Sequence, residues 1–208
     1  MFSRRHIAAV TALLGSLALL GCTHPEANAS PRSPNGASQY WHYPYTSHRH
    51  HTAKHPLRQA LPNPRLTPGA LNPAVTQADI HETICVRGYS RSIRPPEDYT
   101  ERLKRLQIRE YGYRDRWLRD YEEDHLVALS LGGSPTSPEN LWPQPHDVVG
   151  GWGSYAKDRL ETHLHWLVCH RRLPLATAQR DLASDWIAAY QRYIGPTPDN
   201  RRLHWNGG

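Results

Sequence analysis

Residues 121 to 145, YEEDHLVALSLGGSPTSPENLWPQP, constrain the fold more than any other part of this chain. They hold two short runs typical of strands, 121–129 and 141–145, which a Gly-Gly turn and a polar loop separate. A helical pattern follows, with apolar residues at three- and four-residue spacing: Ala156, Leu160, Leu164 and Leu167. We therefore predict a strand, a turn, a second strand and a helix, which together make an α+β arrangement.

Further elements are predicted on both sides of this unit. The run TICV at 83–86 has the β-branched character of a short strand. A helix is expected over 99–111, with Leu103 and Leu106 on one face, and a last helix over 175–193. The central unit should therefore be flanked by helices.

The N-terminus reads as an export signal. Residues 1–22 combine a basic start with an apolar stretch that is too short to span a bilayer permanently. The stretch ends in Leu19-Leu20-Gly21-Cys22, which resembles a bacterial lipobox, whose cysteine is acylated and becomes the new N-terminus. We therefore expect lipidation at Cys22 and a membrane-anchored lipoprotein facing the periplasm or the cell surface. The alternative is an ordinary signal peptide cleaved within 27–30.

Composition divides the remaining chain into three parts. Residues 23–70 are rich in Pro, Ser, Asn and His without apolar periodicity, which predicts a disordered tether. The domain is expected over 71–195, and a flexible tail over 196–208.

The cysteines fit export. With Cys22 lipidated, Cys85 and Cys169 form an even pair in an oxidising compartment, so we expect a disulfide between them. Two buried free thiols are the alternative. Their spacing does not suggest a zinc site.

The net charge is +6, which suits an anionic partner such as nucleic acid or an anionic surface. This charge is weak support by itself, because many exported proteins are basic for other reasons.

Polar residues stand at the corners of the central unit. Asp124 and His125 lie on the first strand, Asn140 precedes the second, and Asp158 comes early in the helix. A compact strand-strand-helix unit can bring these corners together around one metal ion.

These residues resemble the HNH nuclease family, whose ββα-metal motif reads DH, apolar residues, GG, a short loop and N-L. The matching stretches here are DHLVALSLGG and ENLWPQ, with 15 positions between His125 and Asn140. Segments across residues 72–193 also resemble a group of exported bacterial HNH-like proteins. The resemblance implies a central ββα-metal unit and metal-dependent hydrolysis of nucleic acid.

Each motif residue has a physical role in such chemistry. A neutral histidine such as His125 is the natural general base near neutral pH. Asn140 could accept a hydrogen bond from that ring and fix its tautomer. Asp124 and a second oxygen ligand would hold a divalent metal, Mg²⁺ first and Mn²⁺ or Zn²⁺ as alternatives, which acts as a Lewis acid on phosphate.

The third HNH position departs from the family, because His or Asn is expected on the helix and Lys157, Asp158 and Glu161 stand there instead. We assign the second metal oxygen to Asp158, with Glu161 as an alternative, while Lys157 could contact phosphate. Because adjacent residues of a strand face opposite ways, Asp124 and His125 can both point inward only at a bulge or a strand end.

The predicted function is endonuclease-like hydrolysis of DNA or RNA, without a small-molecule cofactor. The sequence sets no oligomeric state. One rival is a degenerate HNH fold that binds a polyanion or a protein without catalysis. The other is a structural envelope lipoprotein.

Overall fold

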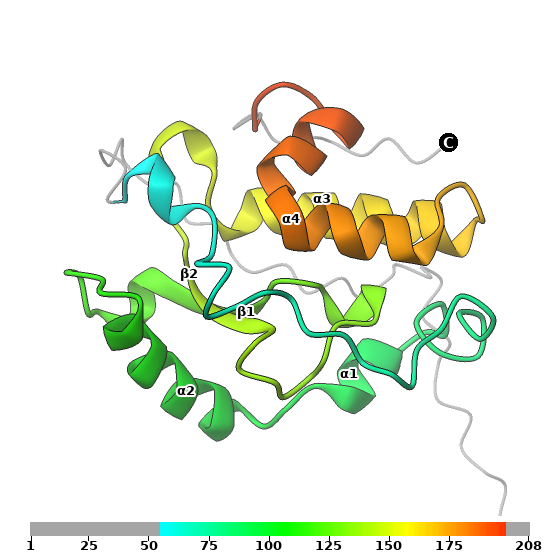
Figure 1. The fold of residues 1–208 in the computed structure, drawn as a ribbon, viewed down its shortest axis with the longest axis horizontal. Helices are drawn as coiled ribbons and strands as arrows, with labels where there is room; N and C mark the ends of the chain where they lie inside the picture. The colour runs from blue at the N-terminus through cyan, green and yellow to red at the C-terminus, as the bar shows by residue number, and fades with distance from the viewer. Residues whose placement is uncertain (1–54, 199–208) are drawn as a thin grey trace, which may run out of the picture. The chain divides into compact units, whose positions relative to one another are not determined.

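The computed structural model describes residues 55–198. Its architecture is α+β, with helices around one two-stranded antiparallel sheet (Figure 1). The elements are η1 (Leu57–Gln59), α1 (Tyr89–Ile93), α2 (Glu97–Glu110), η2 (Leu118–Asp120), β1 (Tyr121–His125), η3 (Leu129–Leu131), β2 (Leu141–Pro145), η4 (Val149–Gly151), α3 (Ser154–Cys169) and α4 (Leu175–Tyr193). No helix within these residues is both long and apolar enough to cross a membrane.

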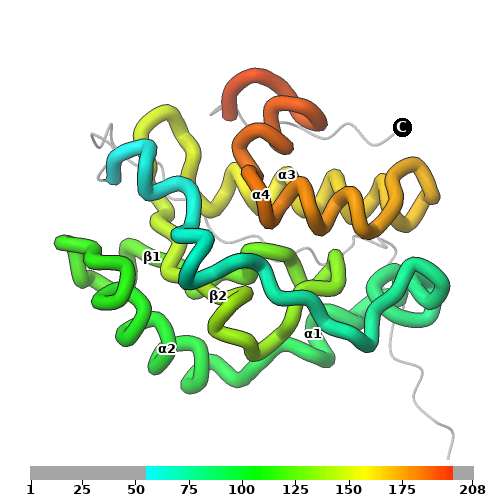
Figure 2. Tube along the Cα trace, viewed as in Figure 1, coloured from blue at the N-terminus to red at the C-terminus, as the bar shows by residue number. Residues whose placement is uncertain are grey.

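The hairpin of β1 and β2 separates two layers of helices. Helix α2 lies on one side of it, and the packed pair α3 and α4 lies on the other (Figures 1 and 2). The larger core fills the α3–α4 side and includes Leu126, Trp142, Leu160, Leu164, Leu182 and Trp186. A smaller cluster under α2 consists of Ile108, Tyr113 and Tyr121.

The register of the hairpin decides which face each polar side chain takes. Asp124 lies opposite Trp142, and His125 lies opposite Leu141. Paired residues share a face and successive residues alternate, so Asp124 sits on the α3 side with Trp142. The second strand, at 141–145, confirms the prediction, whereas the first ends at His125 and does not reach 129. The chain after His125 turns instead into the short 3-10 helix η3.

The two glycines of the turn are required for different reasons. Gly132 has φ +76°, a left-handed conformation that favours glycine. At Gly133 the backbone passes so close to Val127 that an added Cβ would lie 1.7 Å from its carbonyl oxygen. The loop therefore folds back tightly onto the end of β1.

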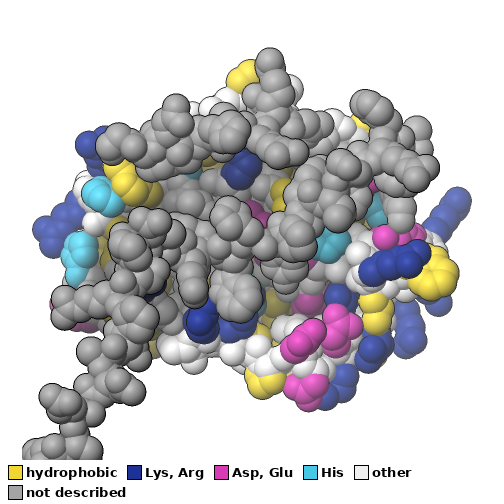
Figure 3. Space-filling view, turned by 180° about the vertical axis from the view of Figure 1, so that it is seen from behind, with side chains coloured by type: hydrophobic (Ala, Val, Ile, Leu, Met, Phe, Trp, Pro, Cys, Tyr) yellow, Lys and Arg dark blue, Asp and Glu magenta, His cyan; other side chains and the backbone are white. Residues whose placement is uncertain are grey.

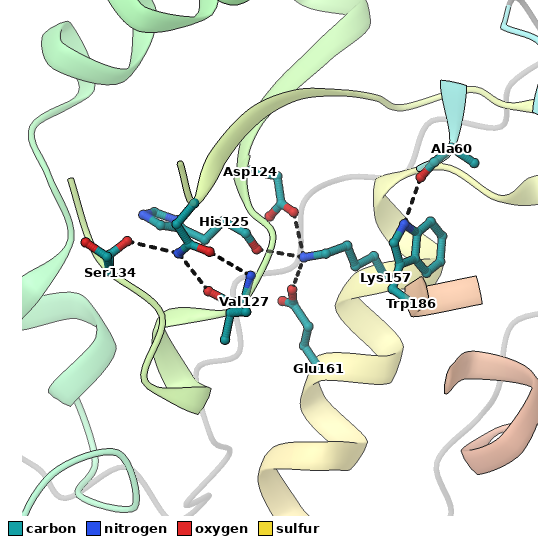
Figure 4. Close-up of polar contacts among 9 residues, drawn as sticks. Ala60, Asp124, His125, Val127, Ser134, Lys157, Glu161 and Trp186 are labelled. Atoms are coloured by element: carbon teal, nitrogen blue, oxygen red, sulfur yellow. Dashed lines mark hydrogen bonds and ion pairs between the residues drawn. The ribbon is translucent and has the colours of Figure 1, made fainter. Parts of the chain in front are cut away.

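Part of the predicted tether is packed onto the domain. Ala60 is fully buried, and its carbonyl accepts a hydrogen bond of 2.7 Å from the Trp186 indole (Figure 4). Thr67 is also fully buried and donates its hydroxyl to the Leu141 carbonyl. The predicted tether boundary at residue 70 is therefore too late. Periodicity did not reveal this segment, because it is held by backbone groups and small side chains.

The segment 83–86 is a turn and not the predicted strand. The only sheet of the described chain consists of β1 and β2, and the segment 83–86 is not paired with either strand. Instead, the Cys85–Cys169 disulfide ties it to the end of α3, which confirms the predicted pair. Ile84, 2% exposed, fills the core beside it.

The long helices match their predictions closely, but the buried face of α2 does not. Leu106 is 53% exposed, while Lys104, Gln107 and Ile108 face the hairpin. The Gln107 side chain donates a hydrogen bond of 2.8 Å to the Leu141 carbonyl. A polar side chain is therefore buried here because it satisfies a backbone group of the hairpin.

Cys22 and most of the predicted tail lie outside the described residues, so lipidation and export remain predictions.

Candidate active site at the hairpin and helix α3

A buried ammonium group joins β1 to α3. Lys157 of α3 is fully buried, and its Nζ lies 2.6 Å from Asp124 Oδ2 (Figure 4). The same ammonium donates to the His125 carbonyl at 2.8 Å and pairs with Glu161 one helical turn away. Three oxygens thus surround one cation. They come from the two sequence regions that were predicted to meet.

The charges of this cluster are only partly balanced. Burial disfavours the charged form of Lys157, but Asp124 and Glu161 outweigh it and raise the pKa of Lys157. One ammonium neutralises one carboxylate, and burial raises the pKa of Glu161 against the opposing effect of Lys157. Asp124 adds to this shift by repulsion.

Two more carboxylates lie close enough to Asp124 for its negative charge to raise their pKa. Burial, with repulsion from Asp124 and Asp158, raises the pKa of Glu122 to about 7. The pKa of Asp158 is also raised, although its side chain is exposed. The larger cause is partial removal from water, and the smaller is repulsion from Asp124. The cluster therefore opens to solvent at Asp158 and carries more carboxylates than nearby cations.

His125 is held as a neutral base. Its ring Nε2 lies 2.9 Å from the Pro135 carbonyl, which can only accept, so Nε2 carries the proton and Nδ1 keeps the lone pair. Burial lowers the pKa of His125, and nearby Arg94 and Lys157 act in the same direction. The ring is consequently neutral and fixed in one tautomer at neutral pH.

Asn140 does not take the predicted role. Its fully buried side chain bonds the backbone N–H and carbonyl of Val127, and it donates to the Ser134 carbonyl at 3.0 Å. The expected hydrogen bond with His125 is therefore wrong. The Pro135 carbonyl accepts from that ring instead, and Asn140 fixes the loop that carries Pro135.

The predicted side chains are gathered only in part. Strand pairing is regular through His125, so β1 has no bulge there, but β1 does end at His125, which is the other expected alternative. Alternation along the strand still places the Asp124 and His125 side chains on opposite faces. Asp124 meets α3, but its direct contact is Lys157 rather than Asp158.

Of the three oxygens around Lys157, the one from Glu161 could have been anticipated from spacing. Lys157 and Glu161 are four residues apart on a helix, so they share a face and form an ion pair. The Pro135 carbonyl had no sequence signal, because any residue supplies a backbone oxygen.

A second group of metal-ligand atoms occurs at the disulfide. Sulfur and nitrogen atoms of Cys85, His165 and Cys169 lie within 4.8 Å of one another, a geometry that could hold a metal ion. The two sulfurs are bonded to each other, and His165 Nε2 lies 3.0 Å from the Ile84 carbonyl. In this oxidised form the group offers no thiolate ligand.

No protein-family model matches the chain, and no curated protein or solved structure is significantly similar to it. Fold class alone does not determine chemistry, because unrelated functions recur on one fold.

Proposed function

We propose that this protein is a metal-dependent endonuclease that hydrolyses nucleic-acid phosphodiester bonds, with an HNH-like ββα-metal unit formed by β1, β2 and α3. The observation that carries the proposal is a neutral histidine of fixed tautomer, His125, next in sequence to a cluster that holds more carboxyl groups than cations. Hydrolysis of a phosphodiester needs these two features, a base for water and a cation site for the phosphoryl oxygens.

The donor set suits a hard divalent cation. Mg²⁺ is commonly held by one or two carboxylates, with water and substrate phosphate as further ligands, so Asp124 and Asp158 suffice for Mg²⁺ or Mn²⁺. Zn²⁺ takes three or four protein ligands. Within residues 55–198 the only triad of His, Cys or carboxylate ligand atoms within 4.8 Å is the one at the disulfide. Zn²⁺ is therefore a poorer candidate for this cluster.

The chain's own residues have separable roles in this proposal. His125 Nδ1 accepts a proton from the attacking water, while Pro135 keeps the ring in the correct tautomer. Lys157 orders Asp124 and provides a fixed positive charge beneath the site. The bound metal would polarise the phosphate as a Lewis acid.

The test is plasmid cleavage by the full chain with Mg²⁺ or Mn²⁺, compared with EDTA. Asp124→Asn should remove cleavage that the wild type shows. Arg180→Gln, on the far helix α4, is the control and should cleave normally. A wild type that leaves plasmid intact with both metals, while folded, would contradict the proposal.

A second candidate is a binding module without catalysis, and Lys157 is the specific observation that favours it. Its ammonium already interacts with both Asp124 and Glu161, as a metal ion would. The two candidates differ in one measurement. A binding module retains nucleic acid in EDTA and never cleaves it, whatever metal is added.

A further inference from the structure

The surface at the end of α2 carries a shallow hollow lined by arginines. It has a volume of about 260 Å³ and is lined by Arg105, Ile108, Arg109, Arg116 and Leu118. Ile108 is almost fully buried and Leu118 is half-buried, whereas the three arginines are exposed. We call this feature the arginine hollow. In Figure 3, which shows the molecule from behind, Lys and Arg side chains lie among Asp and Glu side chains on the side where α2 lies.

The guanidinium groups of the hollow have few partners of their own. The guanidinium groups of Arg109 and Arg116 make no ion pair or hydrogen bond with other residues of 55–198. Within the described part of the chain the Arg105 guanidinium has one ion pair, with Glu101 at 3.9 Å, a distance that contributes little at an exposed site. Basic and acidic residues nearly balance over the described chain, so the hollow is a local concentration of positive charge. Three converging guanidinium groups are well suited to bind phosphate oxygens.

An exposed tryptophan adjoins these arginines. Trp117 follows Arg116 in the chain and is 65% exposed, whereas Trp142 and Trp186 are fully buried. The Arg119 guanidinium lies over one face of its ring, 5.1 Å from the centroid, and the indole as a whole is still largely exposed. Unpaired nucleic-acid bases stack on such aromatic faces.

We propose that the arginine hollow and Trp117 bind single-stranded nucleic acid, with the guanidinium groups on the phosphates and one base on the indole. This inference rests on the proposed function, because it names the substrate form and the surface that holds it. An anionic membrane would be attracted to the same charge, and an exposed indole also suits a membrane interface, so anionic vesicles are a competing outcome of the test. The proposed function favours nucleic acid. A duplex keeps its bases stacked inside, so the indole separates single strands from duplex.

Binding is measured by fluorescence polarisation of a labelled oligothymidylate with the full chain in EDTA, which suppresses metal-dependent cleavage. Trp117→Ala should weaken binding by about 5- to 150-fold, the usual cost of losing one stacked base. A plot of the logarithm of the binding constant against the logarithm of the salt concentration gives the salt dependence as a slope. The double variant Arg109→Gln/Arg116→Gln should make that slope shallower by about 0.7 for each phosphate that is no longer bound by an arginine. Arg109→Lys/Arg116→Lys keeps the charge and should retain most of that salt dependence.

Arg180→Gln is the matched control, since Arg180 is 65% exposed and Arg105 is 55% exposed. It should bind like the wild type. Equal affinity of Trp117→Ala and wild type, or equal retention by duplex, oligothymidylate and anionic vesicles, overturns the proposal. Failure of the nuclease is seen separately, because Asp124→Asn should lose cleavage while its affinity in EDTA is unchanged.

Discussion

Lys157 Nζ lies 2.6 Å from Asp124 Oδ2, so a fully buried ammonium of α3 meets the carboxylate that was predicted to hold a metal. This ion pair ties β1 to α3 and orders the side chain on which the proposed chemistry depends. It also means that Asp124 has a permanent cationic neighbour. Any metal bound there shares the carboxylate with Lys157 or binds its other oxygen.

The first prediction concerns the stability that this ion pair provides. Lys157→Met leaves Asp124 and Glu161 buried without their cation, and such a change typically costs about 3 to 5 kcal/mol. Urea denaturation of the full chain measures it. The triple variant Asp124→Asn/Lys157→Met/Glu161→Gln removes all the charges together and should recover a large part of that stability. If Lys157→Met is as stable as the wild type, the ion pair contributes nothing to the fold.

The second prediction concerns His125 as the base. His125→Ala should lower cleavage by about 10²- to 10⁴-fold when assayed at a temperature where the variant is still folded, because the change also removes a buried ring and its hydrogen bond to Pro135. Because burial lowers the pKa of His125 below its ordinary value, the wild-type rate should rise with pH, with its midpoint below pH 6.5. Stopped-time plasmid assays between pH 4.5 and 8 give this profile. A profile that is still rising well above pH 7 would assign the base to another group.

The third prediction concerns the loop that orients His125. Asn140→Ala removes three hydrogen bonds to Val127 and Ser134 and leaves buried backbone groups unsatisfied, so it should destabilise the domain by about 2 to 4 kcal/mol. Cleavage should fall as well, because the Pro135 carbonyl loses its support. Gly133→Ala should have the same dual effect, since its Cβ would overlap Val127. Ser137→Ala, in the same loop, is the mild control. Full activity in Asn140→Ala would mean that the loop does not position the histidine.

Sequence patterns identified the elements but not the contacts. The two strands, the Gly-Gly turn and helix α3 follow from periodicity and turn residues, which act locally. The disulfide followed from counting cysteines in an exported chain. The turn at 83–86 was mistaken for a strand, because a β-branched residue such as Ile84 can also fill a core beside a disulfide.

The sequence predicted which segments meet at the candidate site, but not which residues contact each other there. Asp124 and α3 do meet, but the residue that pairs with Asp124 is Lys157, which spacing could equally have assigned to solvent. Pro135 takes the task that was expected of Asn140, because backbone carbonyls carry no sequence signal. Likewise, the packing of residues 55–70 depends on single buried groups such as Ala60, and no periodic pattern reveals them.

The fourth prediction concerns the disulfide. Cys85 and Cys169 close a loop with a sequence separation of 84 residues, so Cys85→Ser/Cys169→Ser should lose roughly 3 to 5 kcal/mol in the chain-entropy model. In the wild type, thermal unfolding with and without a reducing agent likewise compares the domain without and with the disulfide. The double variant itself should not respond to the reductant. Equal melting of the reduced and oxidised wild type would show that the bond does not stabilise the domain.

The last prediction concerns Glu123, which lies on the α2 face of the hairpin. Both carboxylate oxygens are buried without a hydrogen-bond partner in the described chain, and burial raises the pKa of Glu123 to about 9. The unfolded chain loses this proton near pH 4.5, whereas the folded domain keeps it up to about pH 9. The contribution to stability is thus complete below the unfolded pKa and is lost as pH rises toward the folded one, by up to about 1.4 kcal/mol per pH unit. Denaturation at pH 5, 7 and 9 measures this.

Glu123→Gln should flatten the decline of the free energy of unfolding with rising pH, because its amide does not titrate. Glu122 and Glu161, whose pKa values are also raised, should leave a residual slope. Glu82→Gln, an exposed site in a turn, should decline with pH as steeply as the wild type. Parallel curves for wild type and Glu123→Gln would mean that Glu123 is ionised in the folded domain, with Lys104 as the cation positioned to stabilise its charge.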